Sequence, residues 1–213
     1  GIHQNKYGNP FLVASRIEAE QLPTILGYGH GDVTRGQEDA WSEGGKPFEL
    51  REHKNRLYGR GTADNKGQHL VNLIAQECVI AKRGRLGFNS KWIIEMGEET
   101  GSPGLEEFCK SNKELLSAQV LIASDGPRLS PDVPLIFLGA RGAINFNLSV
   151  DLREGAHHSG NWGGVLADPA IILAHAISTI TDKDGKIQIP EWQPTSLSQN
   201  VRDLIKKLPL PKG

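Results

Sequence analysis

The strongest constraint on the fold is the alternation of short apolar runs with helical patterns over the first 125 residues. The predicted strands are residues 11–14, 24–28, 91–96 and 120–124, and the predicted helices are residues 66–83 and 103–116. Such alternation is the signature of an α/β domain. Continuously apolar strands are typical of parallel sheets covered on both faces. We therefore expect an α/β fold with a mostly parallel sheet flanked by helices.

Two local patterns add detail to this prediction. The predicted helix 66–83 carries one apolar stripe, made of Leu70, Leu73, Ile74, Cys78 and Ala81. A single stripe indicates a helix that packs one face against the rest of the domain. Residues 48–52 alternate between apolar and charged side chains, which predicts a short strand or one arm of a hairpin.

The alternation of short apolar runs with helical patterns ends near residue 139. Residues 143–152 alternate apolar with polar side chains, which is typical of a strand with one solvated face. Asp168 and Pro169 then open a predicted helix that runs to Ile180, and the proline-containing chain from residue 187 is expected to be mostly irregular. We therefore predict a first domain over residues 1–138 and the start of a smaller α+β domain over residues 139–213.

Charge and hydropathy exclude two classes of partner. The chain of 213 residues has 24 basic and 25 acidic residues, a net charge of −1. We therefore expect no nucleic-acid partner bound through bulk charge. No apolar run approaches the roughly 20 residues that span a bilayer, so no membrane partner is expected. The two cysteines lack a CxxC spacing and are interpreted as buried thiols of a cytoplasmic protein.

Polar side chains of one kind gather at the ends of the predicted strands. They are His30, Asp32, Asp64, Glu98, Glu99 and Asp125. In parallel α/β sheets, ligands gather beyond the carboxyl ends of the strands. If the sheet is parallel, these side chains converge at one edge.

Several carboxylates in one crevice repel one another and are costly to desolvate, so a positive charge is expected among them. One imidazole with several carboxylates suits a divalent cation such as zinc, cobalt or manganese. Asp64 can bridge two ions through its two oxygens, which predicts a two-metal hydrolytic site. Glu98 is then free to act as a general base. Asp32 can accept a hydrogen bond from the second imidazole nitrogen of His30.

Each of these signals has a plainer interpretation when it is taken alone. A single HxD pair is usually structural, and Glu98 with Glu99 is usually a solvated helix start. The glycine-rich loop 59–67 does not match a phosphate-binding loop, because Lys66 is followed by glycine. The metal-site interpretation rests on all the segments lying together at strand ends.

A second glycine-rich loop, residues 156–164, contains His157 and His158. A histidine in such a loop can reach away from its own domain. On its own, a surface histidine is the commoner interpretation.

The order and spacing of these motifs resemble the dinuclear zinc exopeptidase family that includes aminoacylase, carnosine dipeptidase, glutamate carboxypeptidase and succinyl-diaminopimelate desuccinylase. The matching stretches are GHGDV at 29–33, Trp41, Pro47 with Phe48, LYGRGTADNKG at 57–67, EMGEETGSPGL at 95–105, SDG at 124–126, GARG at 139–142 and HSGNWGG at 158–164. The resemblance covers roughly residues 22–180, and the motifs together are highly specific.

The resemblance implies a role for each matching residue. It implies that His30 and Asp125 bind one metal ion, that Asp64 bridges two ions, and that Glu99 binds the other ion. It further implies that Glu98 is the general base and proton shuttle and that Asp32 contacts His30. The cofactor is expected to be two divalent metal ions, most simply zinc, with cobalt or manganese as alternatives.

The resemblance also implies a partner. In this family the smaller domain forms a homodimer, and its loop histidine reaches the partner's active site. Here that histidine is His158, which is expected to polarise the scissile carbonyl as an oxyanion-hole donor does.

The chain departs from the family pattern at both ends. The family supplies one further histidine ligand from a C-terminal segment, but no histidine follows residue 180. The family's first helices and first strand also have no counterpart before Gly1. We therefore expect a fragment or a truncated homologue whose metal site is incomplete and which is itself inactive.

The leading hypothesis is a metal-dependent hydrolase that cleaves an amide bond in a dipeptide or an N-acyl amino acid. The alternative is a non-catalytic fragment or homologue that acts through dimerisation or binding. A metal-free, inactive protein favours the alternative, and substrate panels distinguish peptidase from deacylase.

Overall fold

The computed structural model describes residues 1–42, 45–126, 135–137 and 142–208. The chain divides into two compact units, Gly1–Ala140 and Arg141–Gly213, and each is described by itself. Most of the predicted domain boundary, residues 138–141, lies outside the described residues.

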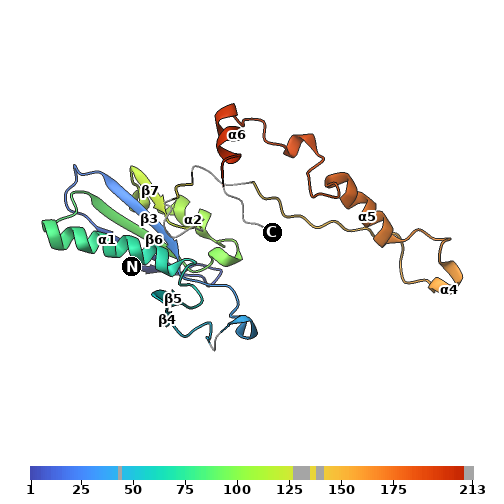
Figure 1. The fold of residues 1–213 in the computed structure, drawn as a ribbon, viewed down its shortest axis with the longest axis horizontal. Helices are drawn as coiled ribbons and strands as arrows, with labels where there is room; N and C mark the ends of the chain where they lie inside the picture. Colours follow the sequence, from blue (N-terminus) through green and yellow to red (C-terminus); the bar gives the residue numbers. More distant parts are fainter. Residues whose placement is uncertain (43–44, 127–134, 138–141, 209–213) are drawn as a thin grey trace. The chain divides into compact units, whose positions relative to one another are not determined.

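The first unit is built on a five-stranded sheet (Figure 1). In order across the sheet its strands are β1 (Ile2–His3), β2 (Phe11–Arg16), β6 (Asn89–Glu95), β3 (Thr24–His30) and β7 (Val120–Ala123). Strand β3 pairs in parallel with both β6 and β7, whereas β1 and β2 continue the sheet antiparallel. The predicted α/β sheet with parallel strands is therefore confirmed, with an antiparallel extension on one side.

Helices cover both faces of this sheet. They are α1 (Lys66–Arg83), α2 (Leu105–Ser111) and α3 (Lys113–Leu116). Helix α1 runs across one face (Figure 1), where Gly29 lies against His69. Neighbouring Tyr28 packs on the opposite face with Phe108 of α2, because successive residues of a strand face opposite sides. No helix in the described ranges is both long enough and apolar enough to cross a membrane.

The predicted strands of the sheet differ from the observed ones by one or two residues at their ends, and two other elements of this unit differ more. The helix expected over residues 103–116 is divided at Asn112, whose backbone is not helical and whose side-chain amide donates to the Phe108 carbonyl at 2.9 Å. Asparagine favours such local bonds over continuing a helix. The strand expected over residues 48–52 begins only at Arg51, where β4 (Arg51–His53) forms a hairpin with β5 (Arg56–Tyr58).

The apolar core lies between the sheet and α2. Phe11 is 1% exposed and stacks on Phe108 with ring centroids 4.6 Å apart. Val13, two residues along β2, is also buried, whereas Leu12 between them faces outward. Strand β2 therefore has the period-two burial that anchors one face of a sheet.

The apolar stripe of α1 is not the face that packs on the sheet. Leu70 and Ile74 are 52% and 48% exposed, and Cys78 on the same stripe is exposed too. The buried residue of the helix is instead His69. The expectation of a buried Cys78 is therefore wrong, because hydrogen bonds at the start of α1 turn a more polar face toward the sheet.

Strand β7 is also more exposed than a continuously apolar strand predicts. Val120, Leu121 and Ile122 are all exposed. The strand pairs with β3 on one side only, and no other described strand pairs with its free edge.

The described part of the second unit contains the α-helices α4 (Ser159–Trp162), α5 (Pro169–Ile180) and α6 (Gln199–Ile205). Helix α5 has the predicted bounds, and the Asp168 carboxylate caps it by accepting from the Ala170 N–H at 2.8 Å. Helix α6 was not predicted, although Ser198 caps it through the Val201 N–H.

The strand predicted over residues 143–152 is wrong. These residues adopt no regular secondary structure. A strand needs a neighbour to satisfy its backbone groups, and no described residue pairs with this segment.

The burial of Phe11 predicts a large stability loss on truncation. Phe11→Ala is expected to lower the free energy of unfolding by about 3–5 kcal/mol, since it removes a core ring and leaves a cavity. The matched control Leu12→Ala removes an exposed neighbour and is expected to cost less than about 1 kcal/mol. Urea unfolding of both variants measures the difference, and equal losses would contradict this description of the core.

Candidate metal centre

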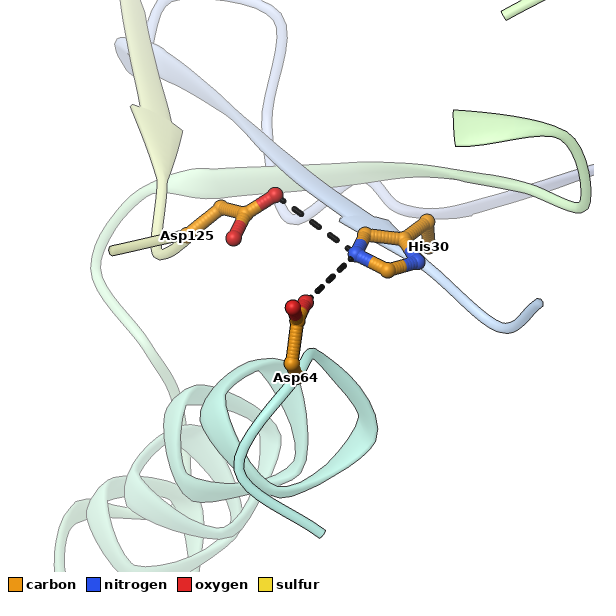
Figure 2. A group of neighbouring side chains, drawn as sticks. All are labelled: His30, Asp64 and Asp125. Carbon is orange, nitrogen blue, oxygen red and sulfur yellow. Dashed lines mark hydrogen bonds and ion pairs between the residues drawn. The ribbon is translucent and has the colours of Figure 1, made fainter. Parts of the chain in front are cut away.

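Three side chains of the type that binds metal ions meet at the carboxyl edge of the sheet (Figure 2). His30 ends β3, Asp64 lies just before α1, and Asp125 follows β7. The His30 Nε2 atom lies 3.0 Å from Asp64 Oδ1 and 3.6 Å from Asp125 Oδ2. One ligand atom from each residue lies within 4.8 Å of the other two.

The strand register explains why two of these residues meet. Tyr28 of β3 pairs with Ala123 of β7 in a parallel ladder. His30 and Asp125 each lie two residues further along, so they leave the sheet side by side. The sequence-based expectation that these residues converge at one edge rests on the same rule for parallel strands.

The geometry of the cluster fits a divalent cation. Zinc binds nitrogen and oxygen ligands at about 2.0–2.2 Å, so ligand atoms of a tetrahedral site lie about 3.3 Å apart. The separations of 3.0 and 3.6 Å from His30 fall around that value. The His30 side chain is fully buried, whereas those of Asp64 and Asp125 are 66% and 30% exposed, so the cluster opens to solvent on its carboxylate side.

The carboxylates control the ionisation of His30. Burial lowers the pKa of the imidazole, but the hydrogen bond to Asp64 and the charges of Asp125 and Asp32 outweigh burial and raise that pKa above its usual value. A proton on His30 would partly neutralise the surrounding carboxylates, which is why they favour the protonated ring. This behaviour is expected of a site built to hold positive charge.

Glu98 approaches the same imidazole from a third strand end. It begins the short 3-10 helix Glu98–Thr100 after β6, and its Oε2 atom lies 3.9 Å from His30 Nε2. Burial raises the pKa of Glu98, His30 opposes the rise, and the charges of the neighbouring carboxylates add to it. A carboxylate with a raised pKa is a stronger base, which suits Glu98 to accepting a proton.

Asp32 connects the ends of β3 and β6. Its Oδ1 atom lies 3.4 Å from His30 Nδ1, on the side of the ring away from Asp64. The same carboxylate accepts hydrogen bonds from the backbone N–H groups of Glu98 at 3.2 Å and Glu99 at 3.0 Å. Asp32 therefore holds the Glu98 turn beside the imidazole.

Two further residues predicted for the site are not among the three clustered ligands. The Glu99 carboxylate is next to Glu98 in the chain but is not one of the three clustered ligands. His158 belongs to the second unit, where it is exposed and its Nδ1 accepts the Gly160 N–H at 3.0 Å at the start of α4.

Sequence reasoning missed one residue of this region, Asn65. It is completely buried and directly follows Asp64, through a cis peptide bond. Asparagine before a helix is commonly interpreted as a capping residue. Here the Asn65 side chain makes no capping bond and instead points toward the strand ends. A polar residue between a ligand-type aspartate and a helix was the only signal in the sequence.

The two bonds made by Asp32 predict the effect of its removal. Asp32→Ala leaves the N–H groups of Glu98 and Glu99 without their charged acceptor and is expected to cost about 1.5–3 kcal/mol. Amide hydrogen exchange at these two positions is expected to accelerate in the metal-free chain. Asp39→Ala, at an exposed acidic residue, is the control and is expected to change neither quantity. Unchanged exchange at Glu98 and Glu99 in Asp32→Ala would contradict the assignment.

Comparison with known proteins identifies a family for this chain. Residues 26–203 match the model of Peptidase family M20/M25/M40. The Beta-Ala-His dipeptidase of Rattus norvegicus is 35% identical over 184 residues, which cover 85% of this chain and 37% of that protein. The cysteinylglycine-S-conjugate dipeptidase of Corynebacterium striatum is 36% identical over 180 residues, covering 84% of this chain and 39% of that protein. The chain therefore spans less than half the length of these relatives.

Solved structures show the same fold. A metallo-carboxypeptidase from Sulfolobus solfataricus has a TM-score of 0.77 and 31% identity, covering 99% of this chain and 48% of that one. Human carnosine dipeptidase 1 has a TM-score of 0.66 and 28% identity, covering 95% of this chain and 43% of that one. The family match covers most of the chain, so this chain belongs to Peptidase family M20/M25/M40.

Proposed function

We propose that this chain carries the metal centre of a peptidase that hydrolyses the amide bond of a dipeptide or an N-acyl amino acid. The observation that carries the proposal is the cluster of His30, Asp64 and Asp125, with Glu98 3.9 Å from the shared imidazole. Relatives named as dipeptidases support peptides as the substrate class.

The proposed cofactor is two divalent cations, zinc first and cobalt or manganese as alternatives. His30 and Asp125 would hold one ion, and Glu99 would hold the other. Asp64 would be a ligand of both ions. The assignments of His30, Asp125 and Asp64 are supported by the clustering of their ligand atoms, and the Glu99 assignment by the resemblance of its motif. Bound cations of this kind act as Lewis acids toward a carbonyl oxygen and make water a stronger acid.

Glu98 is the proposed proton carrier. Hydrolysis adds hydroxide to the carbonyl carbon and a proton to the departing amine nitrogen. Glu98 Oε2 would take that proton from water and later deliver it to the nitrogen. The raised pKa of Glu98 supports the first of these steps, because a carboxylate that holds a proton more tightly is a stronger base.

Asp32 is proposed to orient the His30 ring. Its carboxylate lies on the Nδ1 side of the imidazole, which leaves Nε2 facing Asp64 and Asp125. Carboxylates commonly fix the tautomer of histidine ligands in this way.

The second unit is proposed to form a homodimer contact, with His158 polarising the scissile carbonyl in a partner's site. Its support is the resemblance of the HSGNWGG motif and the exposure of His158. Sedimentation velocity tests the dimer, and a chain that remains monomeric at all concentrations would contradict it.

Metal binding is the first test of the proposed function. After zinc loading and desalting, elemental analysis of the chain is expected to find bound zinc, and this occupancy is expected to be lost in Asp64→Asn. A value near zero in the parent chain would contradict the site. A panel of dipeptides and N-acyl amino acids then separates peptidase from deacylase.

The role of Glu98 makes a separate prediction. Glu98→Gln keeps the size of the side chain but removes the proton acceptor, so in the full-length enzyme turnover is expected to fall by at least about 100-fold. Metal stoichiometry is expected to remain that of the parent chain. Glu106→Gln, at an exposed glutamate of α2, is the control and is expected to retain turnover. Near-parental turnover in Glu98→Gln would identify a different base.

A further inference from the structure

A single buried amide lies beside all three segments that supply the clustered ligands. Asn65 is completely buried. Its Oδ1 atom accepts the backbone N–H of His30 at 3.1 Å, and its Nδ2 atom donates to the Ser124 carbonyl at 2.6 Å. Asp64 precedes it directly in the chain. Asn65 therefore connects the three ligands: it is hydrogen-bonded to the backbone of His30 and of the residue before Asp125, and it directly follows Asp64 in the chain.

The backbone partners fix the orientation of this amide. A backbone N–H can only donate and a carbonyl can only accept, so Oδ1 must face His30 and Nδ2 must face Ser124. The two remaining bonds agree with that orientation. Oδ1 also lies 3.0 Å from His69 Nδ1, and Nδ2 also donates to Gln68 Oε1 at 2.6 Å. Both amide hydrogens and both oxygen lone pairs are thus used.

Gln68 extends the contact to the far side of Asp125. Its Nε2 atom donates to the Gly126 carbonyl at 3.0 Å. The carbonyls on either side of Asp125, those of Ser124 and Gly126, are therefore each held by an amide from the beginning of α1. The Asp125 backbone is fixed from both sides while its carboxylate remains available.

The chain leaves room for this arrangement at Gly29. A Cβ atom on Gly29 would collide with the His69 imidazole. Glycine at this point of β3 lets α1 approach closely enough for Asn65 to reach the His30 backbone. Burial lowers the pKa of His69, so a neutral ring that donates from Nδ1 matches the acceptor role of Asn65 Oδ1.

We propose that Asn65 and Gln68 form an amide relay that positions the metal ligands His30, Asp64 and Asp125 relative to one another. Both are positioning residues, because their amides are hydrogen-bonded to backbone groups at or beside the ligands. The proposal rests on the proposed function in that it takes the cluster to be a metal site. It adds that the spacing of the ligands is set by hydrogen bonds to their backbone neighbours before any metal binds.

The experiment compares Asn65→Ala and Gln68→Ala with a matched control, Asn72→Ala, in the whole 213-residue chain. Asn72 lies on the same helix and donates to the Ser124 hydroxyl at 2.7 Å, but it contacts neither carbonyl beside Asp125. Three quantities are measured for each folded variant: zinc affinity by chelator competition, the visible spectrum of the cobalt-loaded chain, and amide hydrogen exchange without metal.

The relay predicts a graded response. Asn65→Ala is expected to weaken zinc binding by about 10- to 100-fold, the usual effect of losing a residue that orients ligands. Gln68→Ala is expected to weaken it several-fold, and both variants are expected to change the cobalt spectrum. Asn72→Ala is expected to bind zinc within about twofold of the parent chain and to keep its spectrum. A merely structural role would lower the melting temperature but leave the affinity and spectrum of the folded variants unchanged.

Parental zinc affinity and cobalt spectrum in folded Asn65→Ala and Gln68→Ala would overturn the relay. If Asn65→Ala does not fold, the zinc affinity and cobalt spectrum of Gln68→Ala test the relay instead. Gln68 is less buried than Asn65, and its removal leaves the Asn65 bonds to the His30 and Ser124 backbones in place. If the parent chain binds no metal, the proposed function fails by itself. The relay is then decided by exchange at His30 and Asp125: faster exchange than in Asn72→Ala supports it, and equal exchange refutes it.

Discussion

The buried Asn65 amide is the constraint on which the rest of the site depends. A buried amide without partners costs several kcal/mol, so this side chain is stable there only while His30, His69, Gln68 and Ser124 surround it. Those bonds fix the start of α1 against β3 and β7. They also explain why the helix buries His69 and leaves Leu70 and Ile74 exposed. The orientation of α1 therefore follows from the hydrogen bonds at its N-terminal end and not from burial of its apolar side chains.

The parts of the fold that depend on local pattern were predictable from the sequence. The bounds of α1 and α5 follow from helical periodicity, from Gly84 after the first and from Asp168 before the second. The convergence of His30, Asp64 and Asp125 was predictable because parallel strands end at a common edge, and the segments that precede His30 and Asp125 read as strands.

The parts that depend on distant partners were not predictable. Residues 143–152 alternate between apolar and polar side chains but have no described neighbour to pair with. The alternation alone therefore predicted a strand that is not observed. The orientation of α1 was not predictable either, since periodicity identifies an apolar stripe without showing whether that stripe faces the sheet. The role of Asn65 was not predictable because two of its four partners, His30 on β3 and Ser124 after β7, are brought to it only by the assembled sheet.

The long separation of the clustered residues along the chain has a kinetic consequence. Residues 30, 64 and 125 come together only after β7 has joined β3, a pairing between segments about a hundred residues apart. Contacts this distant form late, because the loop-closure entropy is lost before they contribute any stability. A cation bound by all three side chains can therefore bind tightly only to chains in which this pairing is complete. Such an ion stabilises the finished sheet by mass action without accelerating the earlier steps, so it slows unfolding more than it speeds folding.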